Sequence, residues 1–187
     1  MRTKIVLVGY RATGKSTLAA RLAERWGFES VDTDDVVEAR AGKRIADIFA
    51  QDGEPAFRDL EAAVVADLAN DPRPMVLATG GGVPLREENR RILRERGVVV
   101  WLTATVETIA RRMRLDKTTA ARRPALTDAK SPVAEIAKVL AAREPIYREA
   151  ATLSVAVDGK TIDELVEEIA DRVPEFFAEE RSGRRSR

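Results

Sequence analysis

The sequence contains no cysteine and no histidine. Without cysteine there can be no disulfide, no thiolate nucleophile and no cysteine zinc site. Without histidine there can be no Ser-His-Asp triad, no histidine general base and no histidine metal ligand. Acid–base chemistry must therefore come from Asp, Glu, Lys, Tyr or an arginine-assisted water, and any metal should be a hard cation held by oxygen ligands.

Long apolar runs and a strong net charge are also missing. The apolar run at 5–8 is too short for the core of a signal peptide, and the run at 98–102 has the length of a buried strand rather than a membrane span. The net charge is +1, so no overall field favours a nucleic acid or a membrane as partner. We therefore expect a cytoplasmic protein with neither partner, and a monomer.

Short apolar runs alternate with amphipathic patterns along a chain of 187 residues. The apolar runs predict strands at 3–8, 28–32, 75–79, 98–102 and 153–157. Apolar spacing predicts helices at 15–26, 57–69 and 105–114, one opened by Ser131 and Pro132, and one opened by a Thr161–Glu164 capping box. This alternation predicts an α/β fold with three layers, αβα, around a parallel sheet. We expect a single domain at 1–175 and a polar, disordered tail at 176–187.

Residues 9–17 read GYRATGKST, which has the G-x-x-x-x-G-K-[ST] spacing of the Walker A phosphate loop. An apolar strand precedes this loop and an amphipathic helix follows it, as a nucleotide site requires. The backbone N–H groups would face an anion, Lys15 would contact the β- and γ-phosphates, and the Ser16 hydroxyl would reach Mg²⁺. The residues expected to bind ATP here are Arg11, Ala12, Thr13, Gly14, Lys15, Ser16 and Thr17. Ala12 stands where small-molecule kinases of this kind often have glycine, and we expect it to be tolerated there with a negative φ.

The DTD sequence at 32–34 comes at the carboxyl end of the second predicted strand. Ligands of open α/β sheets collect at that edge. Asp32 could hold Mg²⁺ through water, and Asp34 could accept the proton of an attacking hydroxyl. The alternative is that both carboxylates only cap the helix that follows.

Two further motifs favour a small polar acceptor. In GEPAFRDLE at 53–61 a helix is predicted to start near Ala56, and Arg58 could point a guanidinium fork at a substrate carboxylate with Glu61 holding it. The alternative is a surface ion pair. In TGGGV the adjacent glycines permit close backbone approach to a substrate, although a simple flexible turn is also possible; these glycines are Gly80, Gly81 and Gly82.

The stretch 110–126 is rich in arginine and contains a single acid, Asp116. It predicts a mobile basic lid that closes over phosphates, with a solvated basic loop as the alternative. In REPIYR at 143–148, we expect Pro145 to end a helix and present Arg143 at its C-terminus, where it could also serve only as a stabilising cation.

These motifs, in this order from 9 to 148, resemble the shikimate kinase family of P-loop kinases. The resemblance implies a five-stranded parallel sheet in the order 2-3-1-4-5, a lid at about 112–126 and a substrate-binding subdomain at about 33–61. It also implies transfer of the ATP γ-phosphate to the 3-hydroxyl of shikimate, in aromatic amino-acid biosynthesis. Where the family's lid usually reads R-P-L-L, this sequence has Ala125 after Arg123 and Pro124, which should alter lid packing at most.

The resemblance assigns a role to each matching residue. Lys15, Asp34 and Arg123 would be catalytic, and Arg123 would reach the ATP phosphates from the lid. Ser16 and Asp32 would serve Mg²⁺. The residues implied to bind shikimate are Asp34, Arg58, Gly80, Gly81, Gly82 and Arg143. The adenine site is poorly marked, and Lys160 is the nearest basic residue after the last strand.

Other functions remain open at this point. A small P-loop kinase acting on gluconate or a nucleoside monophosphate would share the phosphate loop, as would a nucleotide-binding regulatory module that has lost turnover. A nucleic-acid-binding role for the basic stretch is disfavoured because it contains no aromatic residue on which bases could stack.

Overall fold

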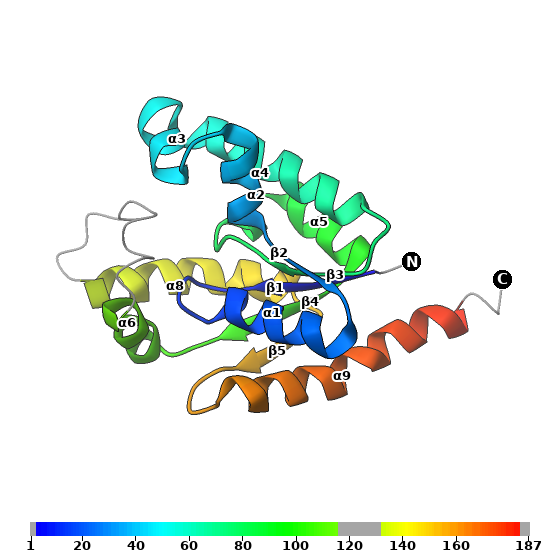
Figure 1. Ribbon diagram of the computed structural model, residues 1–187. Coiled ribbons are helices and arrows are strands. Elements are labelled where there is room, and N and C mark those ends of the chain that lie inside the picture. Colours follow the sequence, from blue (N-terminus) through cyan, green and yellow to red (C-terminus); the bar gives the residue numbers. More distant parts are fainter. Residues whose placement is uncertain (1–2, 116–131, 184–187) are drawn as a thin grey trace.

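The computed structural model describes residues 3–115 and 132–183, with side chains at 3–115 and 133–174. Five parallel strands form one sheet in the order β2-β3-β1-β4-β5 (Figure 1). The strands are β1 Lys4–Val8, β2 Glu29–Asp32, β3 Met75–Ala78, β4 Gly97–Thr103 and β5 Leu153–Ala156. The predicted fold class and strand order are confirmed.

Helices cover both faces of this sheet (Figure 1). They are α1 Lys15–Trp26, α2 Thr33–Ala41, α3 Ile45–Gln51, α4 Gly53–Asn70, α5 Glu87–Arg96, α6 Val106–Leu115, α8 Pro132–Ala150 and α9 Ile162–Gly183, with a 3₁₀ turn, η1, at Val83–Leu85. Helices α1 and α9 share a core with one face of the sheet, and α4, α5 and α8 contribute buried residues to the core on the other face.

Alternation along the strands explains these two cores. In β1, Ile5 and Leu7 point into the core with α1 and α9, whereas Val6 and Val8 point into the opposite one. Because both faces are covered, the central strands are apolar at nearly every position, as the sequence predicted.

A third cluster lies apart from the sheet. Helices α2, α3 and α4 pack around a core of their own, which consists of Val37, Ile45, Ile48, Phe57 and Val64. Figure 1 shows these helices projecting beyond the β2 edge of the sheet. The elements fall within and just beyond the stretch 33–61 that was predicted to form the substrate-binding subdomain.

Several element boundaries differ from the predictions. Helix α4 begins at Gly53 rather than near Ala56, because Pro55 lies in the first turn, where a missing N–H breaks no intrahelical bond. Helix α8 continues through Pro145 to Ala150, so the prediction that it ends at Pro145 is wrong. Pro145 has no N–H to donate to the carbonyl four residues before it. The helix tolerates this lost hydrogen bond because Tyr147 and Ala150, which follow Pro145, are buried in the protein.

Other helices were not predicted or are longer than expected. Helices α3 and α5 were not among the predicted elements, whereas α2 is the helix expected after the DTD sequence. Helix α9 continues to Gly183, so the polar stretch from 176 that was expected to be a disordered tail is helical up to that residue.

Ala12 corrects a further expectation. Its φ is 61°, in the left-handed region, and it is the one non-glycine residue among those described with a positive φ. An L-residue with a Cβ is strained there. Alanine is therefore present in the phosphate loop although its conformation is one that favours glycine.

We expect Ala12→Gly to raise the free energy of unfolding by about 0.5–1 kcal/mol, since relief of the left-handed strain exceeds the entropy that glycine adds to the unfolded chain. The matched control is Ala20→Gly at an exposed position inside α1, which should lower stability by roughly 1 kcal/mol. Urea denaturation measures both. A loss of stability in both variants would contradict the argument from φ.

Candidate active site

The phosphate loop, residues 9–17, curls around the ammonium group of Lys15. Lys15 Nζ donates to the carbonyls of Gly9 (3.0 Å) and Tyr10 (2.8 Å), and Thr13 Oγ1 also donates to Tyr10 O (2.8 Å). Gly14, with φ at 93°, is the N-cap of α1 and directs the helix start into the loop. Loop carbonyls thus hold the lysine charge in place beside the N-terminus of α1, where an anion is favoured.

Gly9 shows why the loop needs glycine at its first position. Its φ is 142°, and a Cβ built there would lie 2.6 Å from the carbonyl oxygen of Leu102 in β4. A side chain on residue 9 would not fit between the end of β1 and the end of β4. The loop therefore begins in direct backbone contact with β4.

Asp32 and Ser16 meet at the carboxyl end of β2. Ser16 Oγ donates to Asp32 Oδ2 at 2.6 Å, and the other carboxylate oxygen accepts from Asp34 N at 3.0 Å, so Asp32 also caps α2. Burial raises the pKa of the Asp32 carboxyl above its usual 3.8; the Ser16 hydrogen bond acts in the opposite direction and the nearby Asp34 charge adds to the rise. A hydroxyl and a carboxylate are the oxygen donors that Mg²⁺ prefers, so this pair fits the predicted metal site.

The raised pKa leads to a prediction for Asp32→Asn. A raised folded-state pKa means that the protonated form is stabilising, and this stabilisation is lost as pH rises from about the unfolded value through the folded one. Asparagine stays uncharged and can still cap α2. We expect the variant without nucleotide to be more stable than the parent at pH 7, with the difference vanishing below about pH 4, where both side chains are uncharged.

Urea denaturation at several pH values measures this difference, and activity with Mg²⁺ should fall in the same variant. Lower stability of Asp32→Asn at pH 7 would contradict the assigned cause of the pKa shift.

Asp34 is half-buried in the first turn of α2, two residues beyond Asp32. Its neighbour Thr33 is buried and accepts a hydrogen bond from Gly80 N through Oγ1 (3.0 Å). That bond ties the start of α2 to the triple-glycine loop, which is residues 80–82. The carboxylate predicted as the base therefore lies on a helix that is anchored to the predicted substrate loop.

Arg58 on α4 lies against this loop. Its guanidinium donates to Glu61 Oε2 (2.7 Å) and to Glu54 Oε1 (3.2 Å), and Glu61 is only 1% exposed. A Cβ on Gly82 would overlap the Arg58 guanidinium. A side chain at 82 would therefore displace the Arg58 guanidinium, and the ion pair with Glu61 is largely buried rather than a surface pair.

Arg143 reaches the same loop from α8. Its Nη1 donates to Gly81 O at 3.2 Å, and Tyr147 Oη donates to the same oxygen at 2.6 Å. A Cβ on Gly81 would lie 3.3 Å from Gly9 O in the phosphate loop. The two arginines predicted to bind a carboxylate therefore converge on one glycine loop, and that loop packs directly on the phosphate loop.

Residues 11–174 match the family model described as shikimate kinase. The chain belongs to the shikimate kinase family. It is 44% identical over 170 residues to the shikimate kinase of Rhodopirellula baltica, covering 91% of this chain and 90% of that one. It is also 44% identical over 171 residues to the shikimate kinase of Symbiobacterium thermophilum, covering 91% and 96%.

A solved structure of a shikimate kinase has the same fold. The enzyme from Acinetobacter baumannii, in complex with shikimate, superposes with a TM-score of 0.85 at 32% identity and covers 94% of both chains. The predicted family and sheet topology are therefore confirmed from sequence and from structure.

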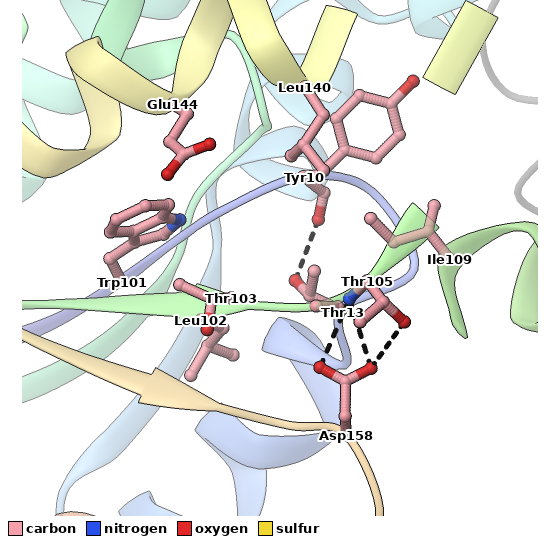
Figure 2. A pocket seen from close by; sticks show the side chains of 11 residues that line it. Tyr10, Thr13, Trp101, Leu102, Thr103, Thr105, Ile109, Leu140, Glu144 and Asp158 are labelled. Carbon is pink, nitrogen blue, oxygen red and sulfur yellow. Dashed lines mark hydrogen bonds between the residues drawn. The ribbon is translucent and has the colours of Figure 1, made fainter. Parts of the chain in front are cut away.

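The cavity of about 220 Å³ in Figure 2 has few of the predicted site residues in its lining. It lies between β4, α6 and α8, behind the phosphate loop, and of the predicted site residues only Thr13 lines it. Asp158 accepts hydrogen bonds from the Thr105 backbone and hydroxyl at its edge, just before α6 begins. These contacts hold the residue that precedes α6.

Two basic residues beyond the phosphate loop, Lys160 and Arg112, make different contacts. Lys160 forms an ion pair with Glu168 on α9. Arg112, which the sequence analysis did not single out, donates to the carbonyls of Ala12 (3.4 Å) and Thr13 (3.2 Å) and lies 3.8 Å from a Cβ built on Gly14. Only its place in a basic stretch could have pointed to it.

The predicted lid can be placed only in part. Residues 112–115 form the end of α6, whereas Arg123 and the rest of the stretch up to 126 lie outside the described residues. Within the described part of the chain, no helix combines the length and apolar composition needed to cross a membrane.

Proposed function

We propose that this protein transfers the γ-phosphate of ATP to the 3-hydroxyl of shikimate, giving shikimate 3-phosphate and ADP. The observation that carries this proposal is the convergence of Arg58 and Arg143 on the triple-glycine loop, which itself lies on the phosphate loop. A carboxylate acceptor held by both arginines would place its ring next to the transferred phosphate. Membership of the shikimate kinase family supports shikimate as that acceptor.

Residues 11–17 would bind the phosphates of ATP, and the ammonium group of Lys15 would contact the β- and γ-phosphates. Lys15 exchanges its bonds to loop carbonyls for bonds to phosphate oxygens, which is a small movement because the side chain is already in the loop. Ser16 and Asp32 would hold Mg²⁺, which supplies charge neutralisation at the β- and γ-phosphates. Arg123 would add a further positive charge from the lid.

Arg112 is a better candidate than Lys160 for the remaining nucleotide contact. It borders Gly14 and the loop carbonyls, whereas Lys160 forms an ion pair with Glu168. We therefore assign Arg112 to the outer wall of the nucleotide site.

The acceptor side would use Asp34 and free backbone donors. Among the hydrogen bonds of the described residues, none uses the N–H of Gly81 or Gly82. These two donors can bind substrate oxygens beside the arginines. Asp34 would orient the attacking hydroxyl and take its proton, and an ordinary carboxylate suffices because a loose phosphoryl-transfer transition state needs little early proton removal.

The direct test measures ADP release with Mg²⁺ and a panel of acceptors: shikimate, quinate, gluconate, AMP, CMP and none. We expect release with shikimate alone. Release with gluconate or a nucleotide would support a kinase activity but show that shikimate is not the acceptor. ATP binding without stimulation by any acceptor would favour a regulatory module. The expected cytoplasmic location, monomeric state and absence of nucleic-acid and membrane partners stay predictions.

A further inference from the structure

Tyr147 is a buried side chain that connects α8 to the triple-glycine loop. It has no measurable exposure, and its hydroxyl donates to Gly81 O at 2.6 Å. Its ring packs beside that of Trp101 in β4, with 6.1 Å between centroids. The ring is thus fixed by the core, so its hydroxyl holds the Gly81 carbonyl from a rigid position.

The rest of the triple-glycine loop is anchored by single hydrogen bonds. Gly80 N donates to Thr33 Oγ1, and Gly80 O and Gly82 O accept from Val83 N and Leu85 N. Gly81 O differs because it accepts from two side chains of α8, Tyr147 and Arg143. This carbonyl is therefore the point where the loop is held most firmly.

The orientation of this carbonyl determines the direction of a backbone donor. A peptide unit is planar and trans, so its C=O and N–H point in opposite directions. Holding Gly81 O toward α8 points the N–H of Gly82 away from α8, and the Arg58 guanidinium lies against Gly82. Neither glycine has a side chain to resist rotation of this peptide plane, so the two α8 donors to Gly81 O hold its orientation.

The shared carbonyl also affects Arg143. In Tyr147→Phe, Arg143 would be the single side-chain donor to Gly81 O. If Arg143 then turned to bind a substrate carboxylate, the buried Gly81 oxygen would lose its side-chain hydrogen bond, which costs free energy. With Tyr147 present, the oxygen keeps a partner when Arg143 turns to the substrate. The tyrosine hydroxyl therefore makes the arginine available.

We infer that Tyr147 is a positioning residue for the acceptor site, which orients the Gly81–Gly82 peptide and frees Arg143 to bind the substrate carboxylate. It acts through these groups and does not touch the reacting atoms. The inference rests on the proposed function, because it concerns the same acceptor site.

The test is Tyr147→Phe, which keeps the ring and its packing and removes one hydroxyl. We expect the KM for shikimate to rise about tenfold, corresponding to the loss of one well-placed polar interaction. The KM for ATP should change less than twofold because Lys15 is held by carbonyls of the phosphate loop itself. Steady-state ADP release with either substrate varied gives this split.

The matched control is Ile169→Val in α9. Ile169 is fully buried in the core on the opposite face of the sheet, so its substitution lowers stability by a comparable amount without touching either loop. Thermal denaturation shows whether the two variants are equally destabilised. We expect only Tyr147→Phe to raise the KM for shikimate.

Equal and unchanged KM values for shikimate in both variants would overturn the inference and leave Tyr147 as a structural residue. A double variant with Arg143→Ala sharpens the test: once the arginine is absent, Tyr147→Phe should raise the KM much less than it does alone, and fully additive effects would contradict the freeing of Arg143. Failure of the proposed function looks different, since the unsubstituted protein would then release no ADP in response to shikimate.

Discussion

Asp34→Asn is expected to lower kcat by about 10²- to 10⁴-fold, the usual contribution of a positioned base, while ATP binding is retained. The substitution conserves shape, but an amide cannot accept the proton of the attacking hydroxyl. Nucleotide affinity should persist because Asp34 lies in α2, and the groups around the phosphates come from the loop and α1. Measuring kcat by ADP release and the Kd for ATP by titration separates these two outcomes.

Asp35→Asn is the control for this variant. Asp35 is exposed in the same turn of α2, so its substitution removes the same charge one residue away and should leave kcat near that of the parent. A kcat of Asp34→Asn close to that of the parent would contradict the assignment of Asp34 as the base.

Arg58→Ala should raise the KM for shikimate by about 100-fold, since it removes a charged contact to a carboxylate that is made in both the ground and transition states. It should also lower the free energy of unfolding by about 3 kcal/mol, because the buried Glu61 carboxylate loses the guanidinium that pairs with it. Arg143→Ala should raise the same KM with less loss of stability, since Gly81 O keeps its bond from Tyr147.

A double variant, Arg58→Ala with Glu61→Gln, separates binding from stability. Removing the buried Glu61 charge should recover much of the lost stability while the KM for shikimate remains high. If KM also returns to the parent value, or does not change in Arg58→Ala, the arginine has only a structural role. Enzyme kinetics together with urea denaturation distinguish these results.

Local pattern was sufficient for the fold and for the residues with distinctive motifs. The alternation of apolar strands with amphipathic helices predicted the three layers, because strands buried on both faces leave an apolar run that is visible in the sequence. The spacing around Lys15 predicted the phosphate loop for a similar reason, since its glycines are required by backbone geometry within a few residues. The family resemblance added the sheet order, which local pattern does not contain.

Boundaries and backbone angles depend on neighbours distant in sequence. Pro145 should end a helix by its own chemistry, yet α8 continues because the turn beyond it is buried against the sheet. Ala12 should have a negative φ, yet its φ is 61° in a loop where its carbonyl accepts from Arg112, 100 residues away. In both cases tertiary contacts outweigh a local preference of a few kcal/mol or less.

The sequence by itself therefore determined the fold class, the phosphate loop, and the chemical groups available for an acceptor, namely one carboxylate, two arginines and three glycines. Only the tertiary structure decided how those groups meet: Arg58 on Gly82, and Arg143 and Tyr147 on one carbonyl of Gly81. A tyrosine at position 147 has no local signature, because its role depends on a contact with a residue 66 positions away. Hydrogen-bond partners at such separations are determined by the packing of α8 against the sheet, which no local pattern specifies.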